Sequence, residues 1–323
     1  MVGNGRAALV LGLLLIAPDA FGEGTRVDKT VEIAGTQRTY IVHLPKGHDA
    51  KIKVPVVFMF HGGGGVGLKY FNTSQWKETG NTNGFISVFP TAQNTCLARG
   101  GGEDYGNYWM TANKLLVVCA NTPVPDDVAF VTAMLGALRT EYAVDDARIY
   151  AAGFSNGMGF ILSQILVKLA HEFAAVGGAG SILTTDKTYV VPPNPSTPVY
   201  AMMGQVDDQF DGIIDLPITY GPYKQSQYID KMETAMTAVV GVKKSPFVAK
   251  RFPKYMKAMY TKPLDSGAQK LYVAILEGLD HVWPQGRPET DKDNGLVAAQ
   301  ILWTFFKKNP QPLKKSATPL LGR

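Results

Sequence analysis

The chain has 323 residues, of which 46% are hydrophobic and 18% are charged. This composition excludes a largely disordered chain, and the length suits a single large domain. The formal net charge is +5, but the basic residues are scattered, without an aromatic-rich basic helix or a zinc-ligand spacing, so we expect no nucleic-acid partner.

The first 22 residues have the pattern of a secretory signal peptide. Arg6 precedes the apolar run Ala7–Ala17, and small residues that form a cleavage site follow. The run is shorter than the roughly 20 residues that span a bilayer, so we expect no membrane anchor in the mature protein. We therefore predict a secreted protein, periplasmic or extracellular, with one folded domain over 23–310 and a disordered tail over 311–323.

The hydrophobic pattern predicts strands that alternate with helices. The residues Thr30–Leu44 alternate polar and apolar side chains around Gly35, which predicts a hairpin. Short apolar runs predict buried strands at Val54–Phe60, Phe85–Phe89, Arg148–Ala152, Phe173–Val176, Val199–Met203 and Leu271–Leu276. Apolar residues at helical spacing predict helices that begin at Asp126 or cover Met158–Leu169, Gln225–Val240 and Gly295–Lys307. This alternation predicts an α/β fold with a mostly parallel central sheet and helices on both faces.

The chain contains two cysteines, Cys96 and Cys119, which are 23 positions apart in a Gly-rich stretch. An even number of cysteines in an exported protein favours a disulfide over two free thiols. Closing such a loop would stabilise the fold by about 3 kcal/mol. The stretch Cys96–Asn121 itself has little regular pattern, and we expect it to be a loop.

The motif GFSNG at Gly153–Gly157 is the only GxSxG in the chain. A strand is predicted immediately before it and a helix immediately after it, which is the context of a nucleophile elbow. In such a turn the serine hydroxyl projects above the sheet, and the glycines allow a close backbone approach. The motif therefore predicts Ser155 as a nucleophile, and a serine that caps a helix is the alternative.

A serine hydroxyl becomes a good nucleophile only when a base removes its proton. In the α/β-hydrolase order, an acid and then a histidine follow the serine along the chain. Four histidines precede Ser155 or lie near the helix that follows it: His43, His48, His61 and His171. His281 lies in a loop after the last predicted strand, so we predict that it is the general base.

The acid is expected in GQVDD, at Gly204–Asp208, directly after the predicted strand Val199–Met203. Asp207 is our candidate and Asp208 is its rival, while Asp211 lies further from the strand end. Asp280 is adjacent to His281, and neighbouring side chains rarely face each other well. The acid would hold the imidazole in one tautomer and stabilise its charged form.

The negative oxygen of a tetrahedral intermediate needs two backbone N–H donors. One is expected from Asn156, directly after the nucleophile. The other is expected from the loop HGGGG that follows the strand Val54–Phe60, and we predict Gly62 and Gly63. We interpret His61 of this loop as structural.

With these residues in place, the chain resembles the polyhydroxybutyrate depolymerase-like esterases, a family that overlaps with bacterial feruloyl and acetylxylan esterases. The similarity runs from about Thr30 to Phe306 and rests on the motifs DDVAFV, YAVDDARIYAAGFSNG, GQVDD and HVWP. It implies an α/β-hydrolase fold and a secreted serine carboxylic-ester hydrolase. It also implies Ser155 as nucleophile, Asp207 as acid and His281 as base, and we expect no metal and no cofactor.

The resemblance leaves the ester open. Feruloyl or acetyl esters of the plant cell wall and polyester oligomers are the expected substrates, and a polyhydroxybutyrate or other polyester depolymerase is the alternative. An inactive secreted binding protein is a further alternative. Trp109 and Trp283, together with Tyr105 and Tyr108, are candidates to stack on a sugar or aryl ring, with ordinary core packing as the other interpretation. The basic segment 243–263 is a candidate lid or substrate wall.

Overall fold

The computed structural model describes residues 23–112, 116–186, 188–192, 195, 197–210, 227–261, 270–287 and 293–311. The predicted signal peptide, residues 312–323 of the predicted tail, and Asp211 lie outside these residues. None of the helices in the described ranges is long and apolar enough to cross a membrane.

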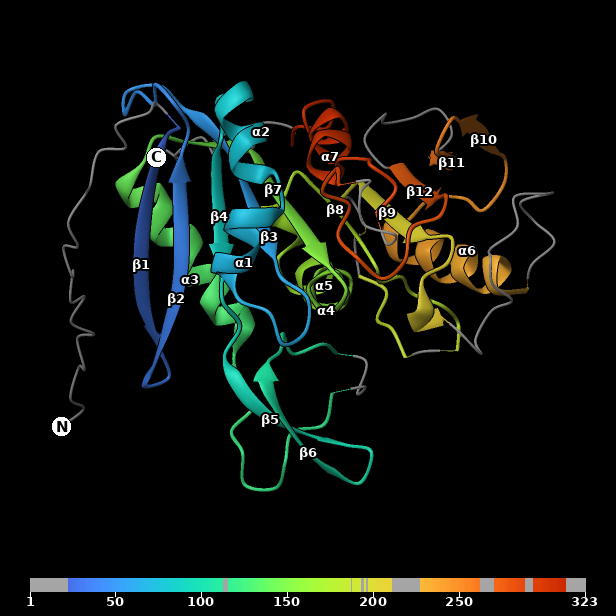
Figure 1. Cartoon of the computed structure of the whole chain (residues 1–323), viewed down its shortest axis with the longest axis horizontal. Helices are drawn as coiled ribbons and strands as arrows, with labels where there is room; N and C mark the ends of the chain where they lie inside the picture. Colours follow the sequence, from blue (N-terminus) through green and yellow to red (C-terminus); the bar gives the residue numbers. More distant parts are fainter. Residues whose placement is uncertain are drawn as a thin grey trace, which may run out of the picture.

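A ten-stranded sheet forms the centre of the molecule (Figure 1). In spatial order its strands are β1 (Thr25–Ile33), β2 (Thr36–Leu44), β4 (Ile86–Pro90), β3 (Val54–Phe60), β7 (Val144–Phe154), β8 (Ala175–Ala179), β9 (Val199–Gly204), β12 (Lys270–Leu276), β11 (Tyr255–Thr261) and β10 (Phe247–Phe252). The six strands from β4 to β12 are parallel, and the pairs at the two edges are antiparallel. The predicted mostly parallel sheet is therefore confirmed.

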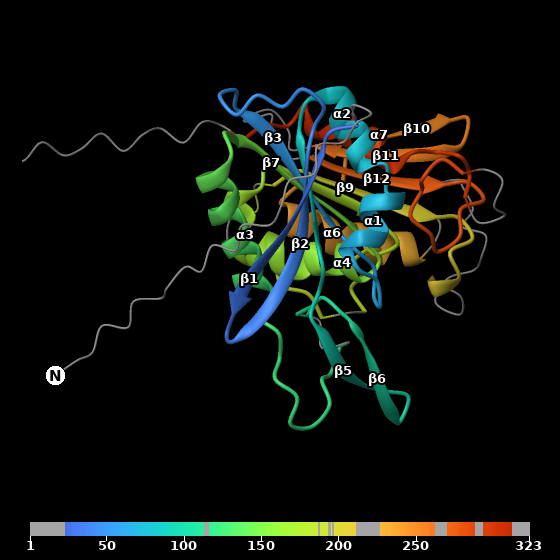
Figure 2. The same cartoon turned by 60° about the vertical axis from the view of Figure 1, so that its left-hand side comes forward.

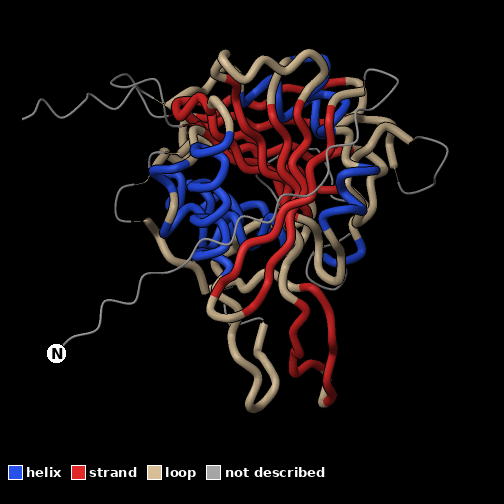
Figure 3. The backbone as a smooth tube through the Cα atoms, turned by 90° about the vertical axis from the view of Figure 1, so that its left-hand side faces the viewer, coloured by secondary structure: helices blue, strands red, loops and turns tan. Residues whose placement is uncertain are grey.

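Helices cover both faces of this sheet, as predicted (Figure 3). One face carries α3 (Asp127–Glu141), α4 (Asn156–Phe160) and α6 (Gln227–Val240), and the other carries α1 (Gly67–Thr73), α2 (Trp76–Asn83) and α7 (Ala298–Phe306). A cluster of buried apolar side chains lies between each helical layer and the sheet. Every residue of β3 is buried because both faces of this strand are covered, which explains its continuous apolar sequence.

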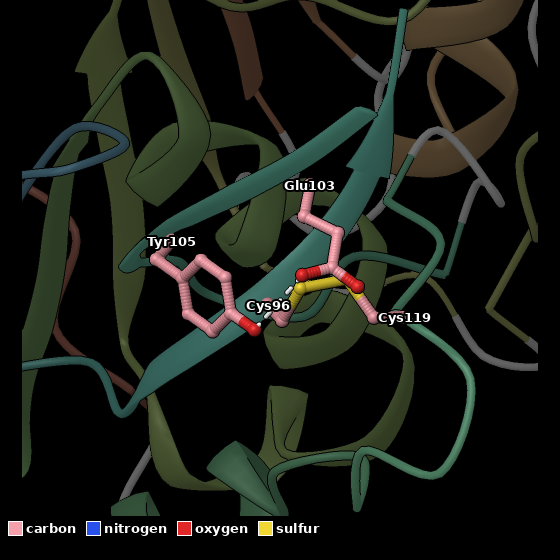
Figure 4. Close-up of a disulfide and its surroundings, with 4 residues drawn as sticks. All are labelled: Cys96, Glu103, Tyr105 and Cys119. Carbon is pink, nitrogen blue, oxygen red and sulfur yellow. Dashed lines mark hydrogen bonds between the residues drawn. A yellow bond between two sulfur atoms is a disulfide. The ribbon is translucent and has the colours of Figure 1, made fainter. Parts of the chain in front are cut away.

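The segment Cys96–Asn121, which we expected to be a loop, holds most of a hairpin that consists of β5 (Asn94–Arg99) and β6 (Gly102–Asn107). This hairpin projects from the body of the molecule (Figures 1 and 2). Most of its residues therefore contact solvent, and β6 has no apolar alternation from which a strand could be predicted. The predicted disulfide between Cys96 and Cys119 is confirmed and ties β5 to the loop that follows (Figure 4).

The segment 243–263 is not a lid in its described part. Residues 247–261 form β10 and β11, which extend the central sheet at its edge. Met256, Ala258 and Tyr260 alternate with half-buried residues and pack into the core below α6. The basic residues hide this period-two pattern, because Lys257 lies on a half-buried position of β11 and Lys250 and Arg251 lie on exposed positions of the neighbouring β10.

Several further elements differ from their predicted bounds, and β7, for example, covers Val144–Phe154 rather than Arg148–Ala152. β8 covers Ala175–Ala179 rather than Phe173–Val176, because Gly177 and Gly178 in its second half give no strand signal. The helix predicted over Met158–Leu169 begins at Asn156 and passes through a π-helical turn at Ile161–Ile165 before it ends in α5 (Leu166–Lys168).

Candidate active site

Ser155 lies in a tight turn between a strand and a helix. β7 ends at Phe154 and α4 begins at Asn156, so the serine alone forms the connection, with φ 49° and ψ −118°. A non-glycine residue rarely adopts a positive φ, and such strain is concentrated at functional sites. The N–H of Ser155 holds the turn by donating to the carbonyl of Ala179 in β8 at 2.8 Å. This is the geometry of a nucleophile elbow.

Close backbone contacts explain the two glycines of the GFSNG motif. A methyl group at Gly153 would lie 2.7 Å from the backbone of Gly157. A methyl group at Gly157 would clash with the carbonyl oxygen of Phe60, at the end of β3. A side chain at Gly153 would therefore force the two halves of the elbow apart, and one at Gly157 would push the elbow away from β3.

The imidazole of His281 bridges a hydroxyl and a carboxylate. Its Nε2 lies 2.9 Å from Oγ of Ser155, and its Nδ1 lies 2.9 Å from both carboxylate oxygens of Asp207. The Asp207 carboxylate is 1% exposed, whereas the imidazole is 18% exposed. The carboxylate of Asp207 thus contacts Nδ1 of the imidazole, while Nε2 on the opposite side of the ring contacts the serine. The structure brings together the three residues that the sequence singled out.

Asp208, the rival acid, is placed differently. It begins the short turn Asp208–Phe210, and its carboxylate accepts a hydrogen bond from the side-chain amide of Gln209 at 3.2 Å. Its own N–H donates to Oδ1 of Asp280 at 3.3 Å. The carboxylate that faces the imidazole is therefore that of Asp207.

Asp280 has a position that the sequence did not indicate. Its Oδ1 accepts the N–H of His281 at 2.7 Å as well as the N–H of Asp208. One carboxylate oxygen thereby connects the loop after β12, which carries the imidazole, with the loop after β9, which carries Asp207. The only sequence signal was a second aspartate directly beside the histidine.

The glycine loop after β3 lies next to the elbow. A methyl group at Gly63 would lie 2.9 Å from the ring of Tyr108 and 3.6 Å from Cβ of Asn156. Within the described ranges nothing accepts a hydrogen bond from the N–H of Gly63. Asn156 is the first residue of α4, so its N–H lacks a partner within the helix. The N–H of Gly62, in contrast, donates to the hydroxyl of Tyr70 at 3.3 Å.

His61, at the start of the glycine loop, is fully buried. Its Nε2 accepts the N–H of Ala92 at 2.9 Å, so its proton lies on Nδ1, which donates to the carbonyl of Gly62 at 2.7 Å. Burial lowers the pKa of His61 to about 4. A neutral histidine with both nitrogens used by backbone groups agrees with the structural role predicted for it.

The two tryptophans expected to stack on substrate are buried instead. The indole of Trp109 is fully buried against Phe60 and Phe160, and its N–H donates to the carbonyl of His61 at 3.1 Å. Trp283 is 6% exposed, and its N–H donates to the carbonyl of Ser74 at 3.0 Å. Core packing leaves neither ring a free face for a ligand, so the substrate role predicted for both is wrong.

The two tyrosines of this region remain accessible. Tyr105 is 66% exposed on the hairpin, and its hydroxyl donates to Glu103 at 3.1 Å (Figure 4). Tyr108 is half-buried beside Gly63, and its hydroxyl donates to Asp104 at 2.7 Å. Of these two tyrosines, Tyr108 is therefore the one that lies next to the glycine loop.

Glu103 also lies beside the disulfide, within 4.8 Å of both sulfur atoms (Figure 4). Two sulfurs and a carboxylate at such distances resemble a metal-binding group. Because Cys96 and Cys119 are bonded to each other, neither offers a thiolate, and the three side chains do not form a metal site.

Solved structures of esterases share the fold of this chain. The acetyl xylan esterase from Aspergillus awamori aligns with a TM-score of 0.54 and 13% identity, over 87% of this chain and 99% of its own. An S-formylglutathione hydrolase from Agrobacterium tumefaciens aligns with a TM-score of 0.57 and 11% identity, over 93% and 100%. A ferulic acid esterase aligns with a TM-score of 0.51 and 15% identity, over 87% and 95%. Neither a protein-family model nor a curated protein matches the sequence. The chain has the α/β-hydrolase fold.

Proposed function

We propose that this protein is a serine carboxylic-ester hydrolase in which Ser155 is the nucleophile, His281 the general base and Asp207 the acid. One observation carries the proposal. The imidazole of His281 lies 2.9 Å from the serine hydroxyl and 2.9 Å from a buried carboxylate on its other side. This arrangement activates a serine for acyl transfer on several unrelated folds.

In the proposed reaction, Oγ of Ser155 attacks the ester carbonyl carbon while Nε2 of His281 takes the hydroxyl proton. The tetrahedral intermediate then collapses, and the leaving alkoxide takes that proton and departs as an alcohol. Water attacks the acyl-enzyme with His281 again as the base, which releases the carboxylic acid and restores the serine. Asp207 keeps the Nδ1 proton in place and stabilises the imidazolium.

The proposed oxyanion hole consists of the N–H groups of Gly63 and Asn156. Both groups are available, and they lie close together, one on the glycine loop and the other at the start of α4 directly after Ser155. Gly62 was an equal candidate in the sequence, but its N–H is directed to the hydroxyl of Tyr70. We assign Gly62 to the shape of the loop, because a methyl group there would lie 2.9 Å from the ring of Phe154.

For the substrate we propose a feruloyl or acetyl ester of the plant cell wall. Two of the proteins that share the fold are an acetyl xylan esterase and a ferulic acid esterase, which supports this class. The half-buried ring of Tyr108 next to Gly63 would contact the sugar or aryl part of such an ester. Polyester oligomers are the second candidate, supported by the motifs shared with polyhydroxybutyrate depolymerase-like esterases.

We also propose that the protein is exported. The signal-like pattern of residues 1–22 supports export, and so does the disulfide, because disulfides form and persist in oxidising compartments.

A parallel hydrolysis assay tests these proposals. The substrates are p-nitrophenyl acetate, butyrate and octanoate, methyl ferulate, and a hydroxybutyrate trimer, with folded Ser155→Ala as the control. Turnover by the wild type alone supports the serine hydrolase, and the ester with the highest kcat/KM identifies the substrate class. If folded wild-type protein cleaves none of them, the inactive binding protein replaces the esterase.

A further inference from the structure

A four-residue segment, 107–110, joins the projecting hairpin to the elbow and the glycine loop, and we call it the strap. It begins at Asn107, the last residue of β6, and passes between two parts of the candidate active site that are far apart in the sequence. One part is the glycine loop after β3, and the other is the start of α4. Each strap residue contacts one of these parts or the layer that supports them.

The strap holds the glycine loop from one side. The carbonyl of Asn107 accepts the N–H of Gly64 at 3.0 Å, and its side-chain amide donates to the carbonyl of Gly65 at 3.0 Å. The ring of Tyr108 packs against Gly63. The indole N–H of Trp109 donates to the carbonyl at the start of this loop, that of His61.

The strap holds the start of α4 from the other side through a reciprocal pair of hydrogen bonds. The N–H of Trp109 donates to Oδ1 of Asn156 at 2.8 Å, and Nδ2 of Asn156 donates to the carbonyl of Trp109 at 2.9 Å. A carboxamide has one donor and one acceptor group, so it can satisfy both backbone groups of one residue. An aspartate at this position would lack the donor.

A buried ion pair anchors the end of the strap. Oδ2 of Asp127 accepts the N–H of Met110 at 2.7 Å, while Oδ1 accepts Nη2 of Arg38 at 2.7 Å. The side chains of Arg38 and Asp127 are 2% and 1% exposed, and the guanidinium lies over the ring of Phe130 at 4.2 Å. The strap therefore ends on α3 and β2, which belong to the rigid core rather than to the site.

We infer that Trp109 and the side chain of Asn156 are positioning residues that set the spacing of the two oxyanion-hole donors. This inference rests on the proposed function. One donor, on Gly63, belongs to a run of four glycines, and the other belongs to the first residue of α4. Both parts are hydrogen-bonded to Trp109, so this residue fixes one relative to the other. Oxyanion stabilisation depends on donors that are held in place before the charge develops.

The test uses Asn156→Ala and Trp109→Phe. The first removes the reciprocal bonds but keeps the backbone N–H of Asn156, so any loss of activity comes from position rather than from a missing donor. The second removes the bond to His61 and keeps an aromatic ring. Ser87→Ala is the matched control, because it deletes one buried hydrogen bond, to the carbonyl of Trp76 at 3.1 Å, on a strand away from the site.

The readouts are kcat and KM for p-nitrophenyl acetate, the inhibition constant of an aryl trifluoromethyl ketone, and the melting temperature. This ketone forms a hemiketal oxyanion on a nucleophilic serine, so its affinity reports on the donors. For Asn156→Ala and for Trp109→Phe we expect kcat to fall by about 10-fold to 100-fold, somewhat less than the loss of a whole donor. We expect KM to stay within about twofold and the inhibition constant to rise in proportion to the loss of kcat.

Turnover by the wild type tests the proposed function. The ratio of kcat between variant and wild type tests the inference that the strap positions the two donors. The inference is overturned if folded Asn156→Ala keeps kcat and inhibitor affinity within about twofold of an active wild type. It is also overturned if Ser87→Ala, at an equal loss of melting temperature, lowers kcat as much. If both residues act through the strap, the double variant loses less activity than the product of the two single losses.

Discussion

The carboxylate of Asp280 and the backbone N–H of Asp208 join two loops that are 72 residues apart in the chain, at 3.3 Å. The same oxygen holds the N–H of His281 at 2.7 Å. We expect Asp280→Ala to lower kcat/KM by about tenfold, because the loop of the base is then free to move against the loop of the acid. Asp280→Asn keeps the acceptor oxygen and should retain most of the activity. Steady-state kinetics on p-nitrophenyl acetate checks this, and equal activity of Asp280→Ala and wild type would refute it.

Asp207 and Asp208 provide a direct comparison between adjacent carboxylates. Asp207→Asn should lower kcat by about 10³-fold to 10⁴-fold, because the amide favours the wrong imidazole tautomer and cannot stabilise the imidazolium. Asp208→Asn should stay within about twofold of wild type, because its carboxylate contacts Gln209 rather than the imidazole. Initial rates of the two purified variants decide the matter. The reverse pattern would show that Asp208 is the acid.

The order of residues along the chain was enough to predict the nucleophile and the base of the candidate site. Ser155 has a strand before it and a helix after it, and His281 is the one histidine beyond the later strands, so their proximity could be predicted. The choice between Asp207 and Asp208 could not, because it depends on how the chain turns after β9. The burial of Trp109 depends on a loop packing against three aromatic rings from distant elements, and no local pattern encodes that.

The same limit applies to the fold. β3, which is covered on both faces, has a continuous apolar run and could be predicted with correct bounds. β6 could not, because it projects into solvent and has no buried face. The candidate lid or substrate wall over 243–263 illustrates the converse error. Lys250 and Arg251 lie on exposed positions of β10 and Lys257 on a half-buried position of β11, and such basic residues resemble a charged loop.

His61 should make stability depend on pH. The unfolded chain protonates this histidine below pH 6.5, whereas the folded chain does so only near pH 4. The contribution of neutral His61 to the free energy of unfolding is therefore complete above pH 6.5. It is lost as the pH falls towards 4, and the loss amounts to about 3 kcal/mol. Urea denaturation of wild type and His61→Gln from pH 7 to pH 4 measures it. We expect a smaller pH slope in the variant, and equal slopes would contradict the buried neutral state.

The disulfide should stabilise the hairpin that leads into the strap. Cys96→Ser combined with Cys119→Ser should lower the free energy of unfolding by about 3 kcal/mol through the loop of 23 residues that it opens. Limited proteolysis should then cut within the segment 94–121 faster than in wild type. Reductant should destabilise wild type and leave the double variant unchanged, which serves as the control. A wild type that is equally stable with and without reductant would contradict this role.

The most direct test of the proposed catalytic site is the covalent capture of Ser155. Wild-type protein, Ser155→Ala and His281→Ala are incubated with diethyl p-nitrophenyl phosphate, and the modified peptide is identified by mass spectrometry. The serine of an activated triad attacks phosphorus and releases p-nitrophenol. We expect one diethylphosphoryl group on Ser155 of the wild type, no adduct on Ser155→Ala, and modification of His281→Ala slowed by at least about 10³-fold. An adduct at another residue, or modification of His281→Ala as fast as that of wild type, would contradict the proposed triad.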